Sequence, residues 1–548
     1  MTSRREFVAL LLGAPFAAAW GCGARGRRIP PGTLVETGMT RGHALVRDWP
    51  SRIAAGDPGG VAGGAGGLPR GIDRHAAPVV TAWRDHAVAI VGAGVAGLAA
   101  AWELRRRGIS DVVVFELDDV TGGTARGGQS AVTRYPWGAH YIVAPQKEQT
   151  ELIALLGELD AIEGEAADGT PIIDEALRCR EPEERVFYRG RWYEGLYLDA
   201  GASTEDRRQL AVFRREIDRW SAWRDAGGKS AFAIPMRCST SDPEVTALDQ
   251  ISFAAWLDAR GLTSERLRWL CDYACRDDYA LFAADTSAWA GLFYFASRQR
   301  TPGGAAQSVL TWPDGNHALV RHLATHATIE TGVAVHSVGE DGQVIAVGRD
   351  GTFGVRARQV ILAVPAFVRN RLVQHGQHGV TYGDYGAWAV ANIHLRARPA
   401  EVHHAPPAWD NVFRDSPSLG YVSATHQRGR DRGPTVWTWY YPFPGDAMHA
   451  RSQLAGAGYA DWAEVVLADL ERAHPDVRAL VDHIEVAFWG HGMIRPRTGS
   501  LFSGARAERA RPVGKIHFAH TDLSGIALFE EAFDHGLRAA REVAEALA

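Results

Sequence analysis

A glycine-rich turn between two apolar segments restricts the fold of this chain more than any other feature. Val88–Val91 is wholly apolar, as expected of a strand that is buried on both faces of a sheet. It leads into Gly92, Gly94 and Gly97, and a helix-like stretch follows from Leu98 to Arg107. The order of strand, Gly-x-Gly-x-x-Gly turn and helix predicts an α/β fold with a parallel sheet.

Each glycine of this turn has a physical reason. Gly92 allows the tight turn, Gly94 lets the backbone approach a pyrophosphate, and Gly97 lets the helix pack closely on the sheet. The helix N-terminus offers free N–H groups and a positive dipole end to phosphates. A second apolar run, Val112–Phe115, ends at Glu116, which is placed to accept hydrogen bonds from a ribose. This pattern predicts a Rossmann-type dinucleotide site made by Gly92, Ala93, Gly94, Ala96, Gly97 and Glu116.

Two later segments decide which dinucleotide is expected. Gly122–Arg126 follows Glu116 closely, and Gly138–Tyr141 comes soon after. In these segments the chain resembles the superfamily of FAD-dependent amine oxidases and phytoene desaturases. In that superfamily a Gly-Gly segment with an arginine lies along the FAD pyrophosphate, and a later Gly-Ala segment passes close to the flavin ring. The resemblance implies FAD, bound in part by Gly122, Gly123, Thr124, Arg126, Gly138, Ala139, His140 and Tyr141.

Three downstream segments extend the resemblance. Trp312–Asn316 resembles the superfamily's Pro-x-Gly-Gly element at the start of a helix. Thr331–Val338 resembles the strand whose valine backbone contacts adenine, and Gln359–Pro365 resembles a strand and turn that end in Ala-x-Pro. The FAD contacts implied in this part of the chain are Val335, Ala363 and Pro365.

The C-terminal segment completes the resemblance. Ile516–Ala519 is typical of a buried strand, and His520–Asp522 stands where the superfamily often has Gly-Glu, whose acid binds the ribityl chain. The N-terminus of the last helix in the superfamily faces the flavin N1/O2 edge, where it stabilises the reduced anion. The residues implied here are Thr521, Asp522 and Ala532.

The matched segments are separated along the chain, so the predicted FAD domain is discontinuous. It comprises residues 86–145, 303–370 and 510–548. Residues 146–302 and 371–509 form a second, substrate-binding lobe of mixed sheet and helices. The predicted fold is therefore α/β, with a Rossmann-type FAD domain beside a substrate lobe.

The first residues have the layout of an export signal. Arg4 and Arg5 stand just before the apolar run Val8–Trp20, which is shorter than the roughly 20 residues that a membrane span needs. The arginine pair resembles a twin-arginine signal peptide, here residues 1–22. This predicts export through the twin-arginine translocase, to the periplasm or to a membrane-anchored state.

Two endings of the signal are open. Ala17–Ala19 resembles a cleavage site, which would release a soluble protein. Ala19–Cys22 resembles a lipobox, in which Cys22 would carry a lipid anchor, although Trp20 is bulky for that motif. Residues 23–85, rich in glycine and proline, predict mostly a linker.

Charge and cysteine content exclude other classes. A formal charge of −5 and a pI near 6.5 give no reason to expect a nucleic acid partner. Five cysteines in 548 residues do not make a disulfide framework. Cys271 and Cys275 share one helix face, and a buried apolar pair is expected there rather than a metal site. No metal site is predicted anywhere in the chain.

The sequence of the substrate lobe does not identify a catalytic residue. Residues 246–298 predict aromatic-rich helices, and residues 419–424 and 435–441 predict strands of a second sheet. The aromatic side chains fit a cage around a substrate, but ordinary core packing is favoured for any single one. His491, Arg495 and Arg497 fit either an anionic group of the substrate or the cap of a surface loop.

The predicted function is that of an FAD-dependent oxidoreductase. It would transfer hydride from a small-molecule substrate, amine-like or apolar, to flavin N5 and pass electrons to oxygen or a quinone. The alternatives are a carotenoid-type desaturase or isomerase, and a flavin-binding protein without turnover. Many amine oxidases of this superfamily hold a water at N5 with a lysine, which is tied to fast reaction with oxygen. The matching region, Tyr385–Asn392, has none, so slow reoxidation by oxygen is expected.

Overall fold

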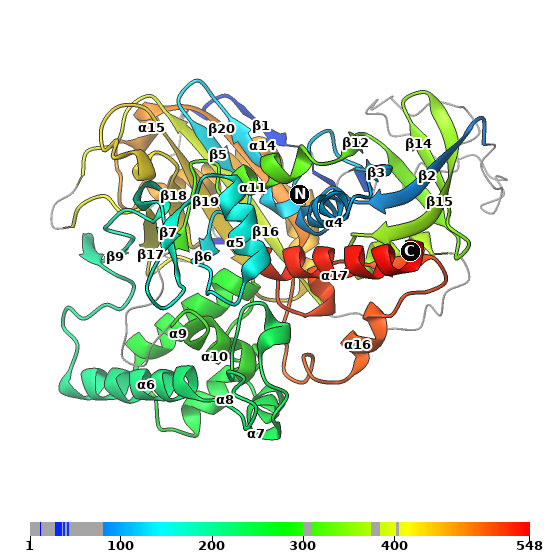
Figure 1. Cartoon of the computed structure of the whole chain (residues 1–548). Coiled ribbons are helices and arrows are strands. Elements are labelled where there is room, and N and C mark those ends of the chain that lie inside the picture. Colours follow the sequence, from blue (N-terminus) through cyan, green and yellow to red (C-terminus); the bar gives the residue numbers. More distant parts are fainter. Residues whose placement is uncertain are drawn as a thin grey trace. The chain divides into compact units, whose positions relative to one another are not determined.

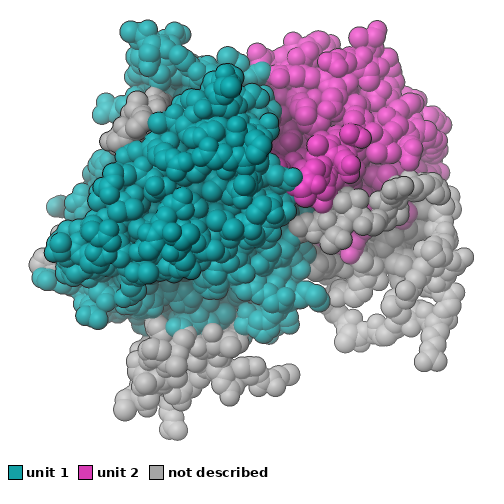
Figure 2. Space-filling view, turned by 90° about the horizontal axis from the view of Figure 1, so that it is seen from below, with its two compact units in different colours: residues 1–35, 127–318, 383–502 teal, residues 36–126, 319–382, 503–548 magenta. Residues whose placement is uncertain are grey.

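The computed structural model describes residues 11–12, 28–35, 37–38, 41–42, 80–299, 309–373, 384–401 and 405–548. The chain forms two compact units, each assembled from separated segments and coloured separately in Figure 2. Unit 1 comprises Met1–Val35, Gly127–Ala318 and Gly383–Phe502, and unit 2 comprises Glu36–Arg126, Leu319–Tyr382 and Ser503–Ala548. Arg4, Arg5, Ala17–Ala19 and Cys22 lie outside the described residues.

Unit 2 is built on a seven-stranded sheet with the path β12-β3-β2-β15-β14-β13, in which β21 also pairs with β15. Strands β12, β3, β2, β15 and β21 are mutually parallel, whereas β14 pairs antiparallel with β13 and β15. The strands are β2 (Trp83–Val91), β3 (Val112–Phe115), β12 (Thr328–Glu330), β13 (Ala334–Val338), β14 (Gln343–Gly348), β15 (Gly351–Leu362) and β21 (Ile516–Phe518).

The apolar runs of the sequence explain the centre of this sheet. All of β3 and the last four residues of β2 are buried, as parallel strands covered on both faces must be. Helices α4 (Val95–Arg106) and α17 (Phe529–Leu547) lie side by side in Figure 1. A Cβ atom on Gly536 would lie only 2.3 Å from the Ala96 carbonyl oxygen, so glycine permits this close approach. The predicted Rossmann-type core is thus present.

Unit 1 contains an eight-stranded sheet in the order β1-β20-β16-β19-β18-β17-β9-β10. Strands β16, β18 and β19 are buried along their whole length, in keeping with their apolar and aromatic sequences. The strands are β1 (Gly32–Val35), β9 (Glu184–Tyr188), β10 (Arg191–Glu194), β16 (Tyr385–Leu395), β17 (Asp410–Phe413), β18 (Gly420–Ser423), β19 (Thr435–Phe443) and β20 (Val481–Ile494). Strands β18 and β19 confirm the two strands predicted for this lobe.

Helices complete unit 1, and those of residues 246–298 confirm the helical prediction. Cys271 and Cys275 are buried on α9, as expected of an apolar pair. The helices are α5 (Thr150–Glu158), α6 (Thr204–Ala222), α7 (Pro243–Thr246), α8 (Phe253–Asp258), α9 (Glu265–Tyr279), α10 (Ala288–Ala296), α13 (Ala447–Gly456), α14 (Tyr459–Leu470) and α15 (Val477–Leu480). Among the described helices, none is both long and apolar enough to cross a membrane.

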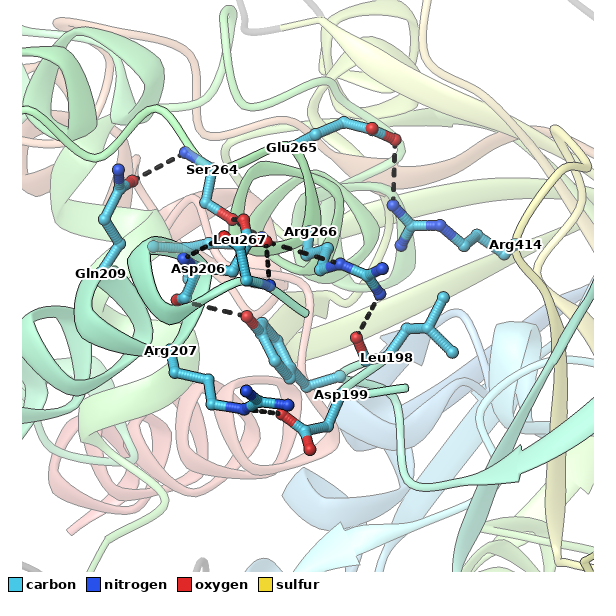
Figure 3. Close-up of polar contacts among 12 residues, drawn as sticks. Leu198, Asp199, Asp206, Arg207, Gln209, Ser264, Glu265, Arg266, Leu267 and Arg414 are labelled. Carbon is cyan, nitrogen blue, oxygen red and sulfur yellow. Dashed lines mark hydrogen bonds and ion pairs between the residues drawn. The ribbon is translucent and has the colours of Figure 1, made fainter. Parts of the chain in front are cut away.

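A shared network fixes the starts of α6 and α9 (Figure 3). Ser203 and Asp206 form a capping box at the start of α6. Asp206 also accepts a 2.6 Å hydrogen bond from the hydroxyl of Ser264, which caps α9. The Gln209 side-chain oxygen accepts from the backbone N–H of Ser264 at 2.7 Å. Hydrogen bonds from Ser264 and Ser203 hold the pKa of Asp206 at about 2, so the network persists at neutral pH. The orientation of α9 is therefore fixed from its first turn.

The predicted linker requires one correction. Gly32–Val35 form strand β1, which pairs in parallel with β20 at the edge of the unit 1 sheet. The Tyr459 hydroxyl donates to the Pro30 carbonyl at 2.9 Å and helps hold the strand. A Cβ on Gly32 would lie 1.9 Å from the Ile484 carbonyl oxygen. Composition alone missed this strand because its partner is about 450 residues away, and backbone pairing supplies its order.

Candidate functional site

The glycine turn of unit 2 has the geometry that each glycine predicts. Gly92 has a φ of +100°, and a Cβ there would lie 2.5 Å from the Ala363 carbonyl oxygen. A Cβ on Gly97 would lie 1.9 Å from the carbonyl oxygen of Gly92, so this residue serves close packing. Apart from its own neighbours in the chain, no heavy atom of the described residues lies within 4 Å of the Cβ position of Gly94. The space above Gly94 is therefore open to a ligand.

The start of α4 is suited to bind an anion. Gly94 is its N-cap and provides no side-chain hydrogen bond, and the first turn carries no acidic residue. A helix N-terminus without an internal cap offers its N–H groups and its positive dipole end to phosphate. The open space at Gly94 and the uncapped helix together fit a pyrophosphate.

Glu116 connects this turn to the end of β3. Its Oε2 accepts from the Ala93 N–H at 2.7 Å, and its Oε1 accepts from the Asp118 N–H at 2.9 Å. Burial raises the pKa of Glu116 to about 7, against the opposing effect of these hydrogen bonds. Each carboxylate oxygen can accept more than one hydrogen bond, so Glu116 can also accept from ribose hydroxyls.

The second Gly-Gly segment lies beside the first. The Gly122 N–H donates to the Ala93 carbonyl at 2.8 Å, and a Cβ on Gly123 would lie 3.5 Å from the Gly94 Cα. Gly122 and Gly123 both have positive φ, and a short 3-10 turn, Gly123–Ala125, follows them. Thr124 is exposed, whereas Arg126 is buried with its Nη1 3.4 Å from Asp118 Oδ2. The fold thus brings the two predicted segments together.

The implied adenine strand also reaches this end of the sheet. The Val333 N–H donates to the Glu116 carbonyl at 2.8 Å, and the Gly332 N–H donates to the Asp118 carbonyl at 3.0 Å. Val335 follows on β13, where it is half-buried. The Ala363 N–H donates to the Val91 carbonyl at 2.8 Å, which places the end of β15 next to the glycine turn.

The C-terminal residues meet the Ala-x-Pro turn. Pro365 is the N-cap of α12 (Ala366–Leu372), and the Ala366 N–H donates to Asp522 Oδ2 at 2.7 Å. Asp522 is buried on the short turn Thr521–Leu523. The residues that line a small pocket of unit 2 at this point include Val364, Ala366, Arg369, Phe518, His520 and Asp522.

Sequence reasoning missed His535, one helical turn beyond Ala532 on α17. Both of its ring nitrogens are buried and lack a hydrogen-bond partner among the described residues. Burial, followed by the nearby charges of Arg538, His520 and Arg506, lowers the pKa of His535 to about 3. A buried imidazole without partners indicates a missing hydrogen-bonding ligand. No motif marks this residue, so only the structure reveals it.

In unit 1, the Gly138–Tyr141 segment is held by polar contacts on both sides. The Gly138 carbonyl accepts from the Tyr440 hydroxyl at 2.9 Å. The side-chain amide of Asn316 donates to the Tyr141 carbonyl at 2.9 Å. A Cβ on Gly315 would lie 2.6 Å from the His140 Cα, so glycine is needed where these segments meet. The predicted Trp312–Asn316 element, which α11 (His317–Ala324) follows, therefore packs against this segment.

His140 lies among three aromatic rings. Its centroid is 5.6 Å from Tyr141, 5.1 Å from Trp409 and 4.9 Å from Tyr440. Burial lowers the pKa of His140 to about 4, partly offset by a hydrogen bond to the Gly138 carbonyl. His140 is therefore neutral at physiological pH.

Four carboxylates gather near these rings, and we refer to Glu183, Glu184, Asp277 and Asp410 as the carboxylate cluster. Glu184 interacts electrostatically with each of the other three. Burial raises the pKa of Glu183 to about 7, and the charge of Glu181 adds to this rise. Burial also raises the pKa of Asp410 to about 7. The pKa values of Glu184 and Asp277 lie well above the ordinary range for the same reason, with neighbouring carboxylates adding to the rise.

Aromatic side chains and one arginine border the cluster. The Tyr273 hydroxyl donates to Asp410 Oδ2 at 3.0 Å. Arg298 forms a 2.9 Å ion pair with Asp278, and its guanidinium lies 4.0 Å from the centroid of the Tyr294 ring. Arg298 Nη2 also donates to the Tyr141 hydroxyl at 3.1 Å. Because Asp278 already pairs with Arg298, the carboxylate cluster carries more potential negative charge than this arginine neutralises.

No motif predicted the cluster. Glu184 and Asp410 lie on paired strands β9 and β17, where they are register partners, and Asp277 lies on α9. Asp410 is separated by more than a hundred residues of sequence from each of the other three acids. The sequence signal was limited to two acidic doublets, Glu183-Glu184 and Asp277-Asp278, each of which adjoins an arginine.

The two arginines left open in the sequence have internal partners. Arg495 is fully buried, and its Nη1 lies 2.9 Å from Asp384 Oδ2. Arg497 Nη2 lies 2.8 Å from the same oxygen. The structure therefore supports a structural role for both, rather than contact with an anionic group of a substrate. The lysines Lys147, Lys229 and Lys515 are all exposed.

Comparison with known proteins agrees with this geometry. A family model described as flavin containing amine oxidoreductase matches residues 95–544. A solved putrescine oxidase with bound putrescine matches with a TM-score of 0.61 and 20% identity, over 84% of this chain and 99% of that one. Cyclohexylamine oxidase from Brevibacterium oxydans IH-35A matches with a TM-score of 0.56 and 17% identity, over 85% and 99%. These likenesses confirm the predicted fold class.

Two further matches are to proteins whose names describe other activities. A CLA-producing fatty acid isomerase from P. acnes matches with a TM-score of 0.58 and 15% identity, over 83% of this chain and 98% of that one. Flavin-containing monooxygenase FMO GS-OX-like 5 from Arabidopsis thaliana is 58% identical over 48 residues. That match covers 9% of this chain and 10% of the relative, so it spans about a tenth of the relative's length.

Proposed function

We propose that this chain, which belongs to the family of flavin containing amine oxidoreductases, oxidises an organic cation of the amine class. Family membership makes it an FAD-dependent oxidoreductase, as its sequence predicts. The carboxylate cluster is the observation that carries the substrate class. Its acids are half-buried beside aromatic rings, and such an arrangement attracts a cation by charge and by contact with ring faces.

The cluster is costly for the free protein. These half-buried carboxylates outnumber the one arginine beside them, and partial burial raises their pKa values because it penalises the charged form. A bound ammonium would stabilise the charged form and offset that cost. A purely apolar substrate would give these acids no role in binding. Their presence therefore argues against a polyene desaturase or isomerase. It argues equally against a flavin carrier that binds no substrate.

The cluster also has a chemical use. FAD, when bound, supplies an acceptor for hydride at its N5 atom. The carbon next to nitrogen releases hydride readily only when the amine is neutral. Glu183 and Asp410, with pKa values of about 7, are suited to accept the proton of the bound ammonium at a carboxylate oxygen. His140, neutral through burial, adds no competing positive charge.

The residues proposed to bind FAD follow from the family resemblance and from the open turn. Gly94 and the uncapped start of α4 support pyrophosphate contacts, and Glu116 supports ribose contacts. His535, with two unpartnered ring nitrogens, is added to them. The full proposal is Gly92, Ala93, Gly94, Ala96, Gly97, Glu116, Gly122, Gly123, Thr124, Arg126, Gly138, Ala139, His140, Tyr141, Val335, Ala363, Pro365, Thr521, Asp522, Ala532 and His535.

Anaerobic reduction of the bound flavin tests the function. Purified protein is titrated with putrescine, cyclohexylamine, an amino acid, a dicarboxylate and a polyene, and flavin absorbance is followed. We expect amines to bleach the flavin and the dicarboxylate to fail, because the cluster repels anions. Bleaching by the polyene but by no amine would overturn the proposal. Flavin that no compound reduces would favour a binding protein without turnover.

We further propose slow reoxidation by oxygen and electron transfer to a quinone. The three lysines are exposed, and β16, the strand containing Tyr385–Asn392, has none. A fixed cation near N5 can contribute about 2.7–4 kcal/mol to a charge-developing step, or roughly 100- to 1,000-fold in rate. Stopped-flow mixing of reduced protein with oxygen measures this rate directly. Reoxidation as fast as in lysine-bearing amine oxidases would contradict the proposal.

Export by the twin-arginine route completes the proposed function. Its support is the placement of Arg4 and Arg5 before an apolar run, and a protein that folds around FAD suits a route for folded cargo. The double variant Arg4→Lys, Arg5→Lys keeps the charge and changes the motif. We expect this variant to stay in the cytoplasm, and its export at the wild-type level would contradict the proposal. Labelling with a lipid precursor distinguishes an anchor at Cys22 from a soluble periplasmic form.

A further inference from the structure

Three potential metal ligands lie together on one face of the unit 1 sheet. His394 is on β16, and His483 and Glu485 are on the adjacent strand β20. His394 and His483 are register partners, and Glu485 is two residues further along, so all three side chains share a face. Their potential ligand atoms all lie within 4.8 Å of one another.

The distances between these potential ligand atoms approach those found around a bound metal ion. His394 Nε2 lies 3.4 Å from Glu485 Oε2. Two ligand atoms on a tetrahedral Zn²⁺ at bond lengths of about 2.0–2.1 Å are separated by roughly 3.3 Å. The imidazoles of His394 and His483 are stacked, with centroids 3.9 Å apart.

A β-bulge positions an outer carboxylate on His483. The pairing register shifts between His394 and Leu395, and this leaves Asp482 as the extra residue of β20. Neighbouring residues of a regular strand point to opposite faces, but a bulge can turn both to one side. Asp482 Oδ2 accordingly lies 2.9 Å from His483 Nδ1. This contact leaves Nε2 of His483 as the ligand atom, in the carboxylate–histidine arrangement typical of metal sites.

Glu485 is oriented in the same way. The Tyr135 hydroxyl donates to Glu485 Oε2 at 2.7 Å, and the Tyr135 ring meets His394 edge-on with centroids 5.0 Å apart. His394 is 5% exposed, whereas His483 is 36% exposed, so an ion can enter from the side of His483.

We propose that His394, His483 and Glu485 bind a divalent transition-metal ion of the zinc class. Two imidazoles and one carboxylate are ligands suited to Zn²⁺, and three protein ligands leave a fourth position for water. Asp482 orients His483, and Tyr135 orients Glu485. The bound ion links β16, β20 and, through Tyr135, the short strand β5 (Arg134–Pro136). The site is independent of the substrate class proposed above.

Metal analysis of the untagged, FAD-loaded protein tests the proposal. After equilibration with Zn²⁺ and gel filtration, we expect wild type to retain one equivalent more than His483→Ala. His449→Ala, a change at an exposed histidine of α13, serves as the matched control and should retain the wild-type amount. Equal zinc in wild type and His483→Ala would overturn the proposal.

Two further measurements separate binding from folding. Asp482→Asn keeps all three ligands, and loss of its outer contact should weaken Zn²⁺ binding about 10- to 100-fold in calorimetric titration. Co²⁺ should give the intense visible bands of a four-coordinate site in wild type, and these should be lost in His483→Ala. Unchanged Zn²⁺ affinity in Asp482→Asn, or Co²⁺ bands retained without His483, would contradict the assignment.

Discussion

The glycine turn of unit 2 and the carboxylate cluster of unit 1 represent two ways in which a chain encodes a site. The turn is continuous: Gly92, Gly94 and Gly97 lie within one βα connection, and their backbone geometry follows from local sterics. The cluster is assembled from β9, β17 and α9, and its properties come from burial. The first kind of site can be read from sequence spacing, whereas the second exists only after the chain folds.

The two regions also differ in how they relate function to stability. The turn satisfies its own backbone, since Glu116 and Gly122 hydrogen-bond to Ala93, and the fold gains from it. The cluster opposes folding because its acids lose hydration without gaining matching cations. Substitutions in the turn should therefore weaken binding without stabilising the protein. Substitutions in the cluster should weaken binding and stabilise the protein.

The largest expected effect is loss of FAD in Gly94→Val. Beyond the adjoining residues, the described part of the chain has no heavy atom within 4 Å of the Cβ position, so the side chain fits the free protein but occupies the space for the pyrophosphate. We expect FAD affinity to fall by more than about 100-fold, or 2.7 kcal/mol, while the apoprotein Tm stays near wild type. Gly97→Val is the matched contrast, because a Cβ there would lie 1.9 Å from a carbonyl oxygen and should destabilise the apoprotein itself. Normal FAD binding by Gly94→Val would remove the turn from the site.

The next effect concerns Asp410→Asn in the carboxylate cluster. Loss of one preorganised charge should lower kcat/KM for an amine roughly 100- to 1,000-fold. The same change should raise the Tm, because a half-buried acid with a raised pKa is replaced by a neutral group. Asp168→Asn, at an exposed acid of unit 1, controls for general charge effects. A variant that keeps its amine kinetics would show that the cluster is structural.

A smaller effect is expected for Glu116→Ala. Loss of charge-assisted hydrogen bonds to ribose should cost about 1.5–3 kcal/mol, which weakens FAD binding roughly 10- to 100-fold. The change also releases the Ala93 N–H, so the apoprotein should lose some stability. Fluorescence titration of apoprotein with FAD measures the affinity, with the exposed Asp119→Ala as control. Unchanged affinity would exclude Glu116 from the site.

The smallest effect is a pH dependence of amine binding. Glu183 and Asp410 have pKa values of about 7, and an ammonium binds their ionised forms. Affinity should therefore increase as pH rises through 7, by up to about tenfold per pH unit for one linked proton. The KM for an amine, measured across this range, should fall with rising pH and change less in Asp410→Asn.

Protein stability should change with pH in the opposite direction to amine affinity. The folded-state pKa values of these acids are raised above their ordinary values near 4. Their contribution to stability is thus fully present below pH 4 and is lost as pH rises through about 7. The Tm of the ligand-free wild type should therefore fall as pH rises through about 7, and the Tm of Asp410→Asn should fall less. Equal pH profiles for the two proteins would contradict the pKa assignment.

The sequence by itself determined the Rossmann-type core, the cofactor and the main helices and strands. Backbone requirements such as the positive φ of Gly92 and the full burial of β3 are local, so they leave a readable pattern. Resemblance then added segments as far apart as Gly122 and Asp522, which the fold places at the same end of the unit 2 sheet.

Only the tertiary structure decided which polar groups meet. The pairing of β1 with β20, the partners of Arg495, the unpartnered nitrogens of His535 and the carboxylate cluster all depend on contacts between distant segments. Burial and charge proximity are properties of the folded neighbourhood, and no spacing rule encodes them. The same holds for His394 and His483, which become neighbours only because β16 pairs with β20 in one register.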